Sequence, residues 1–277
     1  MRIGARAHDF GKLPADELAR RIAATGMSCV QLALTKAIEG IDLRPGQLNS
    51  GLAYEIGQAF HRHGVQIAVL GCYINPIHPD PVVRRSLIGF FKEHLRHARD
   101  FGNSLVALET GSLNADYSPH PDNQSEEAFQ VMLGTFEELV AEAEKFGVVV
   151  GVEGVTSHTV STPARMRRLL DAIPSNNLQV VFDPVNFFSI ENHREQERVV
   201  RESFEQFGDR IAIVHAKDFI AERNALRTVR AGKGACNYRP VIAWLEANKP
   251  SVSILLEEAG EDTAAECAAY LRGAAAP

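Results

Sequence analysis

The chain has 277 residues, a length that fits one large α/β domain. Its hydrophobic fraction of 45% indicates a globular protein, and no run of about 18 apolar residues predicts a transmembrane helix. The net charge of −6 argues against nucleic acid as a partner. The N-terminus shows neither a hydrophobic signal core nor a cleavage pattern, so we expect a cytoplasmic protein. The four cysteines lie far apart, and we expect reduced core residues.

Strand-like apolar runs alternate with helical patterns from one end of the chain to the other. We expect strands near residues 2–8, 28–34, 65–72, 104–110, 148–153, 178–183, 211–216 and 252–257. The intervals between them are too long for hairpins and suit parallel β–α–β crossovers. Eight such units predict an α/β fold, a (β/α)8 TIM barrel that forms a single domain over residues 1–277. An open, doubly wound sheet is the alternative, but no G-x-G-x-x-G motif follows the first strand.

The expected helices have readable ends. Gly64, Gly102 and Gly147 each close a helical pattern directly before a strand, because glycine suits the left-handed position that stops a helix. Thr162 is expected to cap the helix that begins at residue 163. His94, on an outer helix, is expected to face solvent. The longest expected loop, residues 111–125, follows a strand and has the length of an active-site lid.

Four apolar runs in the second half of the chain each end on one side chain that can bind a metal. These side chains are Glu153, Asp183, His215 and Glu257. An isolated buried charge is costly, and a divalent cation shared by the four would balance them. Barrel active sites lie at the C-terminal ends of the strands, where these residues stand. The competing interpretation is that each polar residue only ends its strand.

The ligand set favours oxygen-binding metals. Three carboxylates and one imidazole suit Mn²⁺, which we expect first, or Mg²⁺, while Co²⁺ and Zn²⁺ are alternatives. Glu258 is the alternative ligand to Glu257, and the alternation of side chains along a strand favours Glu257.

These residues resemble the xylose isomerase-like TIM-barrel superfamily, in particular its sugar phosphate isomerase/epimerase group. The resemblance lies in Val152-Glu153-Gly154, Phe182-Asp183-Pro184-Val185-Asn186, Val214-His215-Ala216-Lys217-Asp218 and Leu256-Glu257-Glu258, with a Gly232-Lys233-Gly234 turn before the last strand. In similar ketose 3-epimerases, the matching Glu, Asp, His and Glu bind one metal that chelates sugar oxygens. The two glutamates of those enzymes exchange a proton through an enediolate.

By this resemblance, Glu153 and Glu257 are the catalytic acid/base pair as well as metal ligands, while Asp183 and His215 are ligands only. Several relatives carry a histidine where this chain has Asn186, and an Asp-x-His pair where residues 229–231 read Val-Arg-Ala. The sequence therefore predicts a single metal ion and argues against the trinuclear zinc site of the superfamily's endonucleases.

Seven residues at strand ends or in the following loops are candidate substrate-binding residues: His8, Gln31, Tyr73, Glu109, His158, Asn186 and Lys217. Each also has a purely structural interpretation. Lys217 could pair with Glu109 or Asp183 instead of an anionic substrate group, and His158 could simply be exposed at the rim.

The function expected first is a metal-dependent isomerase or epimerase of a small sugar, polyol, sugar phosphate or hydroxy-keto acid. A lyase or dehydratase of the same barrel type is the second hypothesis, and a non-catalytic sugar-binding barrel is the third. Endonuclease activity is the least expected. The exposed barrel helices are compatible with a homo-oligomer, although no diagnostic stripe marks an interface.

Overall fold

The computed structural model describes residues 1–275. The barrel strands are β1 (Arg2–Arg6), β2 (Cys29–Leu32), β3 (Gln66–Gly71), β4 (Leu105–Glu109), β5 (Val149–Glu153), β6 (Leu178–Phe182), β7 (Ile211–Ala216) and β10 (Ser253–Leu256). They form a closed barrel in the order β1-β10-β7-β6-β5-β4-β3-β2, and all its pairings are parallel. The predicted (β/α)8 TIM barrel with a single domain is confirmed, and the open sheet is wrong.

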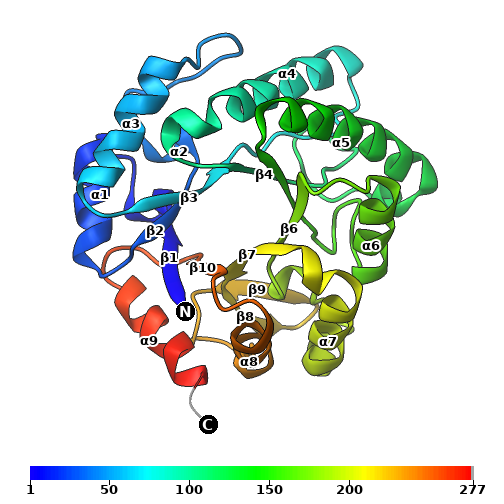
Figure 1. Cartoon of the computed structure of the whole chain (residues 1–277). Coiled ribbons are helices and arrows are strands. Elements are labelled where there is room, and N and C mark those ends of the chain that lie inside the picture. The colour runs from blue at the N-terminus through cyan, green and yellow to red at the C-terminus, as the bar shows by residue number, and fades with distance from the viewer. Residues whose placement is uncertain (276–277) are drawn as a thin grey trace.

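Helices surround the barrel as an outer ring (Figure 1). They are α1 (Ala15–Ala24), α2 (Leu34–Ala37), α3 (Ser50–Arg62), α4 (Pro81–His97), α5 (Glu126–Phe146), α6 (Pro163–Ala172), α7 (Gln196–Phe207), α8 (Arg239–Asn248) and α9 (Ala264–Ala274). Short 3-10 turns are η1 (Ala7–Phe10), η2 (Ala98–Phe101), η3 (Pro121–Gln124), η4 (Val185–Phe187), η5 (His193–Glu195) and η6 (Gly208–Arg210). The chain closes the ring where β10 pairs with β1.

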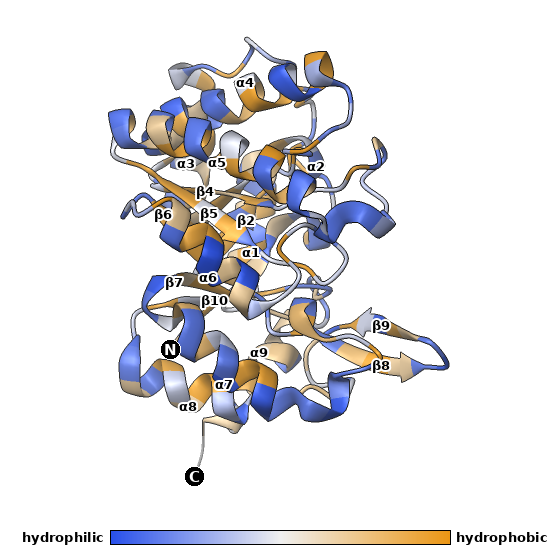
Figure 2. Ribbon diagram, turned by 90° about the vertical axis from the view of Figure 1, so that its right-hand side faces the viewer, coloured by the Kyte–Doolittle hydropathy of each residue, from blue (hydrophilic) through white to orange (hydrophobic). Residues whose placement is uncertain are grey.

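The expected strands match the observed ones closely, with one correction at the first strand and one addition. The strand expected over residues 2–8 ends at Arg6, because η1 begins at Ala7. The sequence analysis missed an antiparallel hairpin, β8 (Asp218–Glu222) with β9 (Ala225–Val229), which directly follows β7. This hairpin projects from the barrel (Figure 2).

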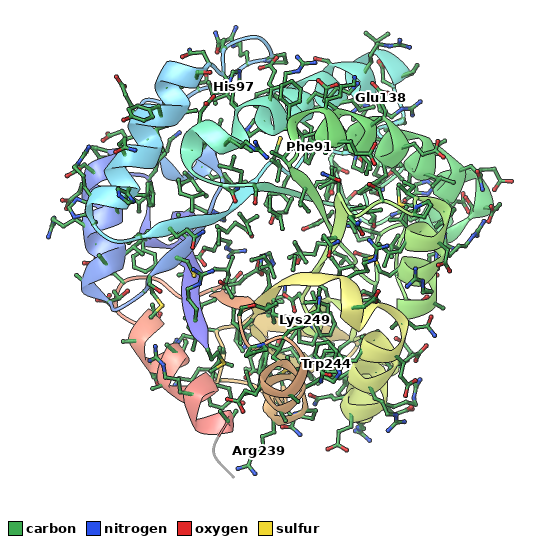
Figure 3. The ribbon with its side chains drawn as sticks, in the orientation of Figure 1. Phe91, His97, Glu138, Arg239, Trp244 and Lys249 are labelled. Carbon is green, nitrogen blue, oxygen red and sulfur yellow. The ribbon has the colours of Figure 1, made fainter. Side chains whose placement is uncertain are left out.

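The hydrophobic core has two parts. The larger one lies between strands and helices, where residues such as Phe91 are fully buried, while Glu138 on α5 is exposed (Figure 3). The indole of Trp244 on α8 stacks on Phe204 of α7 with ring centroids 4.2 Å apart. A second, smaller cluster consists of inward-facing strand residues: Cys29, Val69, Leu105, Ala107, Val181, Ile213 and Leu255. Its members fill the barrel, so the polar site must lie at one end of it.

The predicted helix ends are confirmed. Gly102 and Gly147 adopt the left-handed conformation directly after η2 and α5. The Thr162 side chain accepts a hydrogen bond from the backbone N–H of Arg165 at the start of α6. The expectation for His94 is wrong: its side chain is buried on the inner face of α4, where its Nδ1 lies 3.0 Å from the carbonyl oxygen of Phe90.

All four cysteines are buried and free of disulfides, as expected for reduced core residues. Among residues 1–275, no helix is both long enough and apolar enough to cross a membrane.

Candidate metal centre

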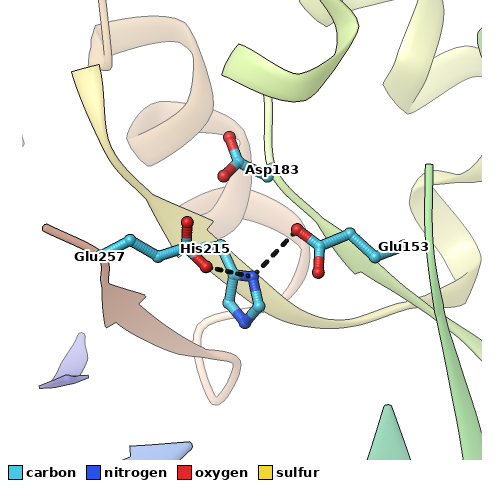
Figure 4. A group of neighbouring side chains, drawn as sticks. All are labelled: Glu153, Asp183, His215 and Glu257. Carbon is cyan, nitrogen blue, oxygen red and sulfur yellow. Dashed lines mark hydrogen bonds and ion pairs between the residues drawn. The ribbon is translucent and has the colours of Figure 1, made fainter. Parts of the chain in front are cut away.

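Four neighbouring strands bring the predicted ligands together at the C-terminal end of the barrel. Glu153 ends β5 and His215 lies near the end of β7, while Asp183 and Glu257 directly follow β6 and β10. These strands are consecutive in the barrel. Each of the four residues offers one ligand atom, and these atoms all lie within 4.8 Å of one another (Figure 4). We call this group of four residues the acidic cluster.

Local backbone contacts hold these residues in place. The N–H of Glu257 donates to the carbonyl oxygen of Ala216 at 3.0 Å, which extends the pairing of β10 with β7 by one residue. Asp183 Oδ1 accepts the N–H of Val185 at 2.8 Å, where the chain turns into η4. The other oxygen, Asp183 Oδ2, faces the Lys217 ammonium at 2.9 Å.

The spacing of the ligand atoms fits a divalent metal. His215 Nδ1 lies between the two glutamates, 3.1 Å from Glu153 Oε1 and 3.4 Å from Glu257 Oε1 (Figure 4). Adjacent ligands in an octahedron with metal–oxygen bonds of about 2.1 Å are about 3 Å apart. The four residues are between 0% and 6% exposed, so their charges need a partner inside the protein. The donor set and its burial therefore fit a divalent ion.

The pKa values of the residues in the acidic cluster are set by burial and by the neighbouring charged side chains. Burial lowers the pKa of His215, but the Glu153 and Glu257 carboxylates outweigh burial and raise it to about 9. Burial would raise the pKa of Glu257, but Lys217, His215 and Arg6 together lower it below its ordinary value. Burial raises the pKa of Asp183, and the Lys217 ammonium partly opposes this shift. Because imidazole binds metals in its neutral form, metal binding at His215 would release a proton.

The backbone directs the side chains of Glu257 and Glu258 to different places. Glu257 belongs to the acidic cluster, whereas Glu258 has a φ of 58° and a side chain that is 45% exposed. The Glu258 carboxylate pairs instead with Arg6 at 3.1 Å. The alternation of side chains along the strand favours the same residue, Glu257, as a ligand.

A cavity of about 410 Å³ opens above the acidic cluster. Both Glu153 and Glu257 line it, and so do five of the predicted substrate-binding residues: His8, Gln31, Tyr73, Glu109 and Lys217. Gln31 is almost fully buried and donates from Nε2 to the hydroxyl of Tyr73 at 2.6 Å. Burial and the charge of Arg6 lower the pKa of His8 to about 4, so its imidazole is neutral at pH 7.

The other two predicted substrate-binding residues do not line the cavity. Asn186 donates from Nδ2 to Glu153 Oε1 at 2.8 Å and thereby orients that glutamate. His158 is buried, so the expectation of rim exposure is wrong. Its Nδ1 lies 3.2 Å from Glu109 Oε2, and its ring packs edge-on against Tyr117. Burial lowers the pKa of His158 to about 4.

Lys217 takes one of the two structural roles considered for it. Its ammonium is 2.9 Å from Asp183 Oδ2 and does not form an ion pair with Glu109. Burial and the nearby Glu153 raise the pKa of Glu109 to about 8.

The loop of residues 111–125 lies at the cavity, where Tyr117 forms part of the wall. Asn75 fixes this loop to the end of β3 by donating to the carbonyl oxygen of Ser112 at 2.7 Å. A role as a mobile lid stays a prediction.

Sequence reasoning missed the role of Asp218. This fully buried carboxylate accepts four backbone N–H groups, those of Phe219, Gly232, Gly234 and Cys236. The Gly232-Lys233-Gly234 turn is thus wrapped around a buried anion, and a Cβ at Gly234 would come within 2.2 Å of the Phe219 carbonyl oxygen. The hairpin β8–β9 also contributes Thr228 to the cavity wall.

Comparison with known proteins places this architecture in a family. The model of the xylose isomerase-like TIM barrel family matches residues 19–274. No curated protein matches the chain.

Several solved structures share the fold at low sequence identity. A D-tagatose 3-epimerase-like protein is 19% identical, with a TM-score of 0.77 over 99% of this chain and 97% of its own. The probable 3-DHS dehydratase AsbF of Bacillus anthracis, involved in petrobactin synthesis, is 13% identical, with a TM-score of 0.74 over 98% of this chain and 99% of its own. The IolI protein, solved with a bound zinc atom, is 17% identical, with a TM-score of 0.72 over 99% of this chain and 96% of its own.

At these identities the solved structures establish a common fold, whereas the family model spans most of the sequence. The chain belongs to the xylose isomerase-like TIM barrel family.

Proposed function

We propose that this protein is a divalent-metal-dependent isomerase or epimerase that moves a proton on a small sugar, sugar phosphate or hydroxy-keto acid. One observation carries the proposal. Glu153 and Glu257 approach His215 Nδ1 from two sides, and both line the same cavity (Figure 4). Two carboxylates on opposite sides of a bound carbon can remove a proton from one face and return one to the other.

The acidic cluster would hold the metal through Glu153, Asp183, His215 and Glu257. A bound divalent ion would act as a Lewis acid and stabilise negative charge on the substrate oxygens. We expect Mn²⁺ first, because three of the four ligands are carboxylates. The bound zinc of the IolI structure makes Zn²⁺ the second metal to test.

Side chains of the protein would transfer the proton, orient the second carboxylate and bind the substrate hydroxyl groups. Glu257 lines the cavity and would accept the substrate proton as the general base. Asn186 holds Glu153 through its hydrogen bond at 2.8 Å, so the second carboxylate is fixed in direction. Gln31 and Tyr73 present an amide and a hydroxyl to the cavity, where they can bind substrate hydroxyl groups.

A dehydratase is the second candidate function, because of Glu109. A dehydratase needs an acid to protonate the leaving hydroxyl, and the Glu109 carboxyl, whose pKa is raised by burial and by Glu153, lines the cavity. The likeness to the probable 3-DHS dehydratase supports the same alternative.

Hydrogen exchange tests the proposal. Manganese-loaded protein is incubated in D₂O with D-fructose, D-tagatose and D-psicose, and NMR follows deuterium at carbons next to the carbonyl. We expect exchange in the unchanged protein and none in Glu153→Gln or Glu257→Gln. Glu258→Gln is the comparison at the neighbouring position, because Glu258 lines the cavity but lies outside the acidic cluster. It should retain more of the exchange than either cluster variant.

The outcomes separate the candidates. Exchange that persists in both cluster variants would refute the acid/base assignment. A product lighter by one water would favour the dehydratase. A chain that binds sugar but neither exchanges hydrogen nor retains metal would be the non-catalytic barrel.

A further inference from the structure

Lys217 forms ion pairs with two of the four residues of the acidic cluster. Its Nζ lies 2.9 Å from Asp183 Oδ2 and 3.0 Å from Glu257 Oε2. The side chain is 10% exposed, and it comes from the end of β7, two residues after His215. The ammonium is therefore built into the centre and is not a surface charge that reaches in by chance.

The Glu257 carboxylate is divided between two kinds of partner. Its Oε1 faces His215 Nδ1 at 3.4 Å, on the side of the acidic cluster, while its Oε2 faces the Lys217 ammonium at 3.0 Å and, more distantly, the Arg6 guanidinium at 3.5 Å. In two-metal enzymes the ions stand about 3.5–4 Å apart, close enough for one carboxylate to bind both. Here the oxygen that would reach a second ion binds an ammonium.

The charges of the acidic cluster need positive partners. Glu153, Asp183 and Glu257 supply three negative charges, and His215 is neutral when it binds a metal. One divalent ion and the Lys217 ammonium supply three positive charges against them. Arg6, which also lies near Glu257, is itself paired with Asp9 and Glu258.

A second ion would have to share the ligands of the first. Among residues 1–275, the cluster has no His, Cys, Asp or Glu member beyond its four. Asn186 turns an N–H donor, not an oxygen, toward Glu153.

We propose that Lys217 occupies the place of a second divalent cation, so that the centre holds one metal ion and one fixed ammonium. This inference rests on the metal site of the proposed function. The Lys217 side chain also lines the cavity, so its ammonium can stabilise a substrate oxygen from the side where a second metal would stand in a two-metal enzyme.

Manganese titration tests this inference without any activity measurement. The full chain is stripped of metal and titrated with Mn²⁺, while bound ions are counted by equilibrium dialysis and followed by electron paramagnetic resonance. The unchanged protein should bind one Mn²⁺ per chain and show the spectrum of an isolated ion.

Lys217→Met should bind its first Mn²⁺ more tightly by about tenfold or more, because a neighbouring positive charge is gone. It should also take up a second Mn²⁺, with the line broadening that spin coupling between close ions produces. Lys217→Arg, which keeps the charge, should bind one ion. Lys36→Met removes another cavity-lining lysine that has no ion pair to the acidic cluster, and it should behave like the unchanged protein.

Three results would overturn the inference. Two coupled ions in the unchanged protein would overturn it directly, even if Lys217→Met did not fold. One ion bound with unaltered affinity by Lys217→Met would overturn it while leaving the metal site intact. No bound Mn²⁺ in the unchanged protein would overturn both the inference and the proposed function.

Discussion

Replacing Asp218 with asparagine tests how one buried carboxylate holds the chain beyond the β8–β9 hairpin. Its Oδ1 accepts the N–H groups of Phe219 and Cys236 at 2.8 and 2.7 Å. Its Oδ2 accepts those of Gly232 and Gly234 at 3.0 and 2.9 Å. Asparagine has nearly the same shape but only one acceptor oxygen. Either orientation of its amide therefore places an NH₂ group against two backbone donors.

The expected loss follows from these contacts. A hydrogen bond to a charged group contributes about 1.5–3 kcal/mol, and two such bonds are lost in Asp218→Asn. We expect the free energy of unfolding to fall by about 3–6 kcal/mol, which is a large part of the stability of an ordinary domain. Urea denaturation should show a lower midpoint at an unchanged slope.

Asp209→Asn is the control for this experiment, because the Asp209 side chain is 70% exposed. Its unfolding free energy should stay within about 0.5 kcal/mol of that of the unchanged protein. A loss of less than about 1 kcal/mol in Asp218→Asn would refute the reasoning, since buried donors left without acceptors cost more than that.

Two further predictions concern acid and metal. Burial lowers the pKa of His94 from 6.5 to about 4, so the folded protein binds this proton less readily than the unfolded chain does. The stability contributed by the neutral His94 is fully present above pH 6.5 and is lost as the pH falls toward 4. By pH 4 this loss amounts to about 3 kcal/mol. His94→Gln should thus lose less stability than the unchanged protein between pH 7 and pH 4.5 in urea denaturation, and parallel losses would contradict this. Mn²⁺ at about 100 times its Kd should add about 2.7 kcal/mol and raise Tm by about 5 °C. EDTA should reverse this shift and Asp183→Asn should abolish it, whereas an unaltered Tm with Mn²⁺ would count against the metal site.

The barrel was predictable because its strands are buried on both faces. In the sequence, such strands are apolar runs that stop at a glycine or a charged residue, and the observed strands end at or near these residues. The acidic cluster was predictable for a related reason. The ends of neighbouring parallel strands meet at one end of the barrel, so side chains at strand ends come together whatever the loops do.

The β8–β9 hairpin was not predictable from local signals. Tight hairpins favour Asn-Gly or Asp-Gly, because their turns need positive φ angles. Here the turn is Arg223-Asn224, and Arg223 adopts a φ of 48° without being glycine. The pairing of the two strands stabilises a turn that the turn residues alone do not favour.

Side-chain contacts between residues far apart in the sequence could not be predicted from the sequence either. Asp218 binds N–H groups up to 18 residues later, and no periodicity records such a contact. The burial of His158 depends on Tyr117, which packs edge-on against its ring. Strand alternation placed Lys217 on the face of His215, but the partners of its ammonium depend on side-chain directions across three strands.

The metal site is tested most directly by a crystal structure of the manganese-loaded protein, with anomalous diffraction measured at the manganese edge. We expect one strong anomalous peak within bonding distance, about 2.0–2.3 Å, of Glu153, Asp183, His215 and Glu257, with Lys217 still beside it. Absence of a peak at the acidic cluster, or a peak bound by other residues, would contradict the central claim that these four strand-end residues hold one metal ion.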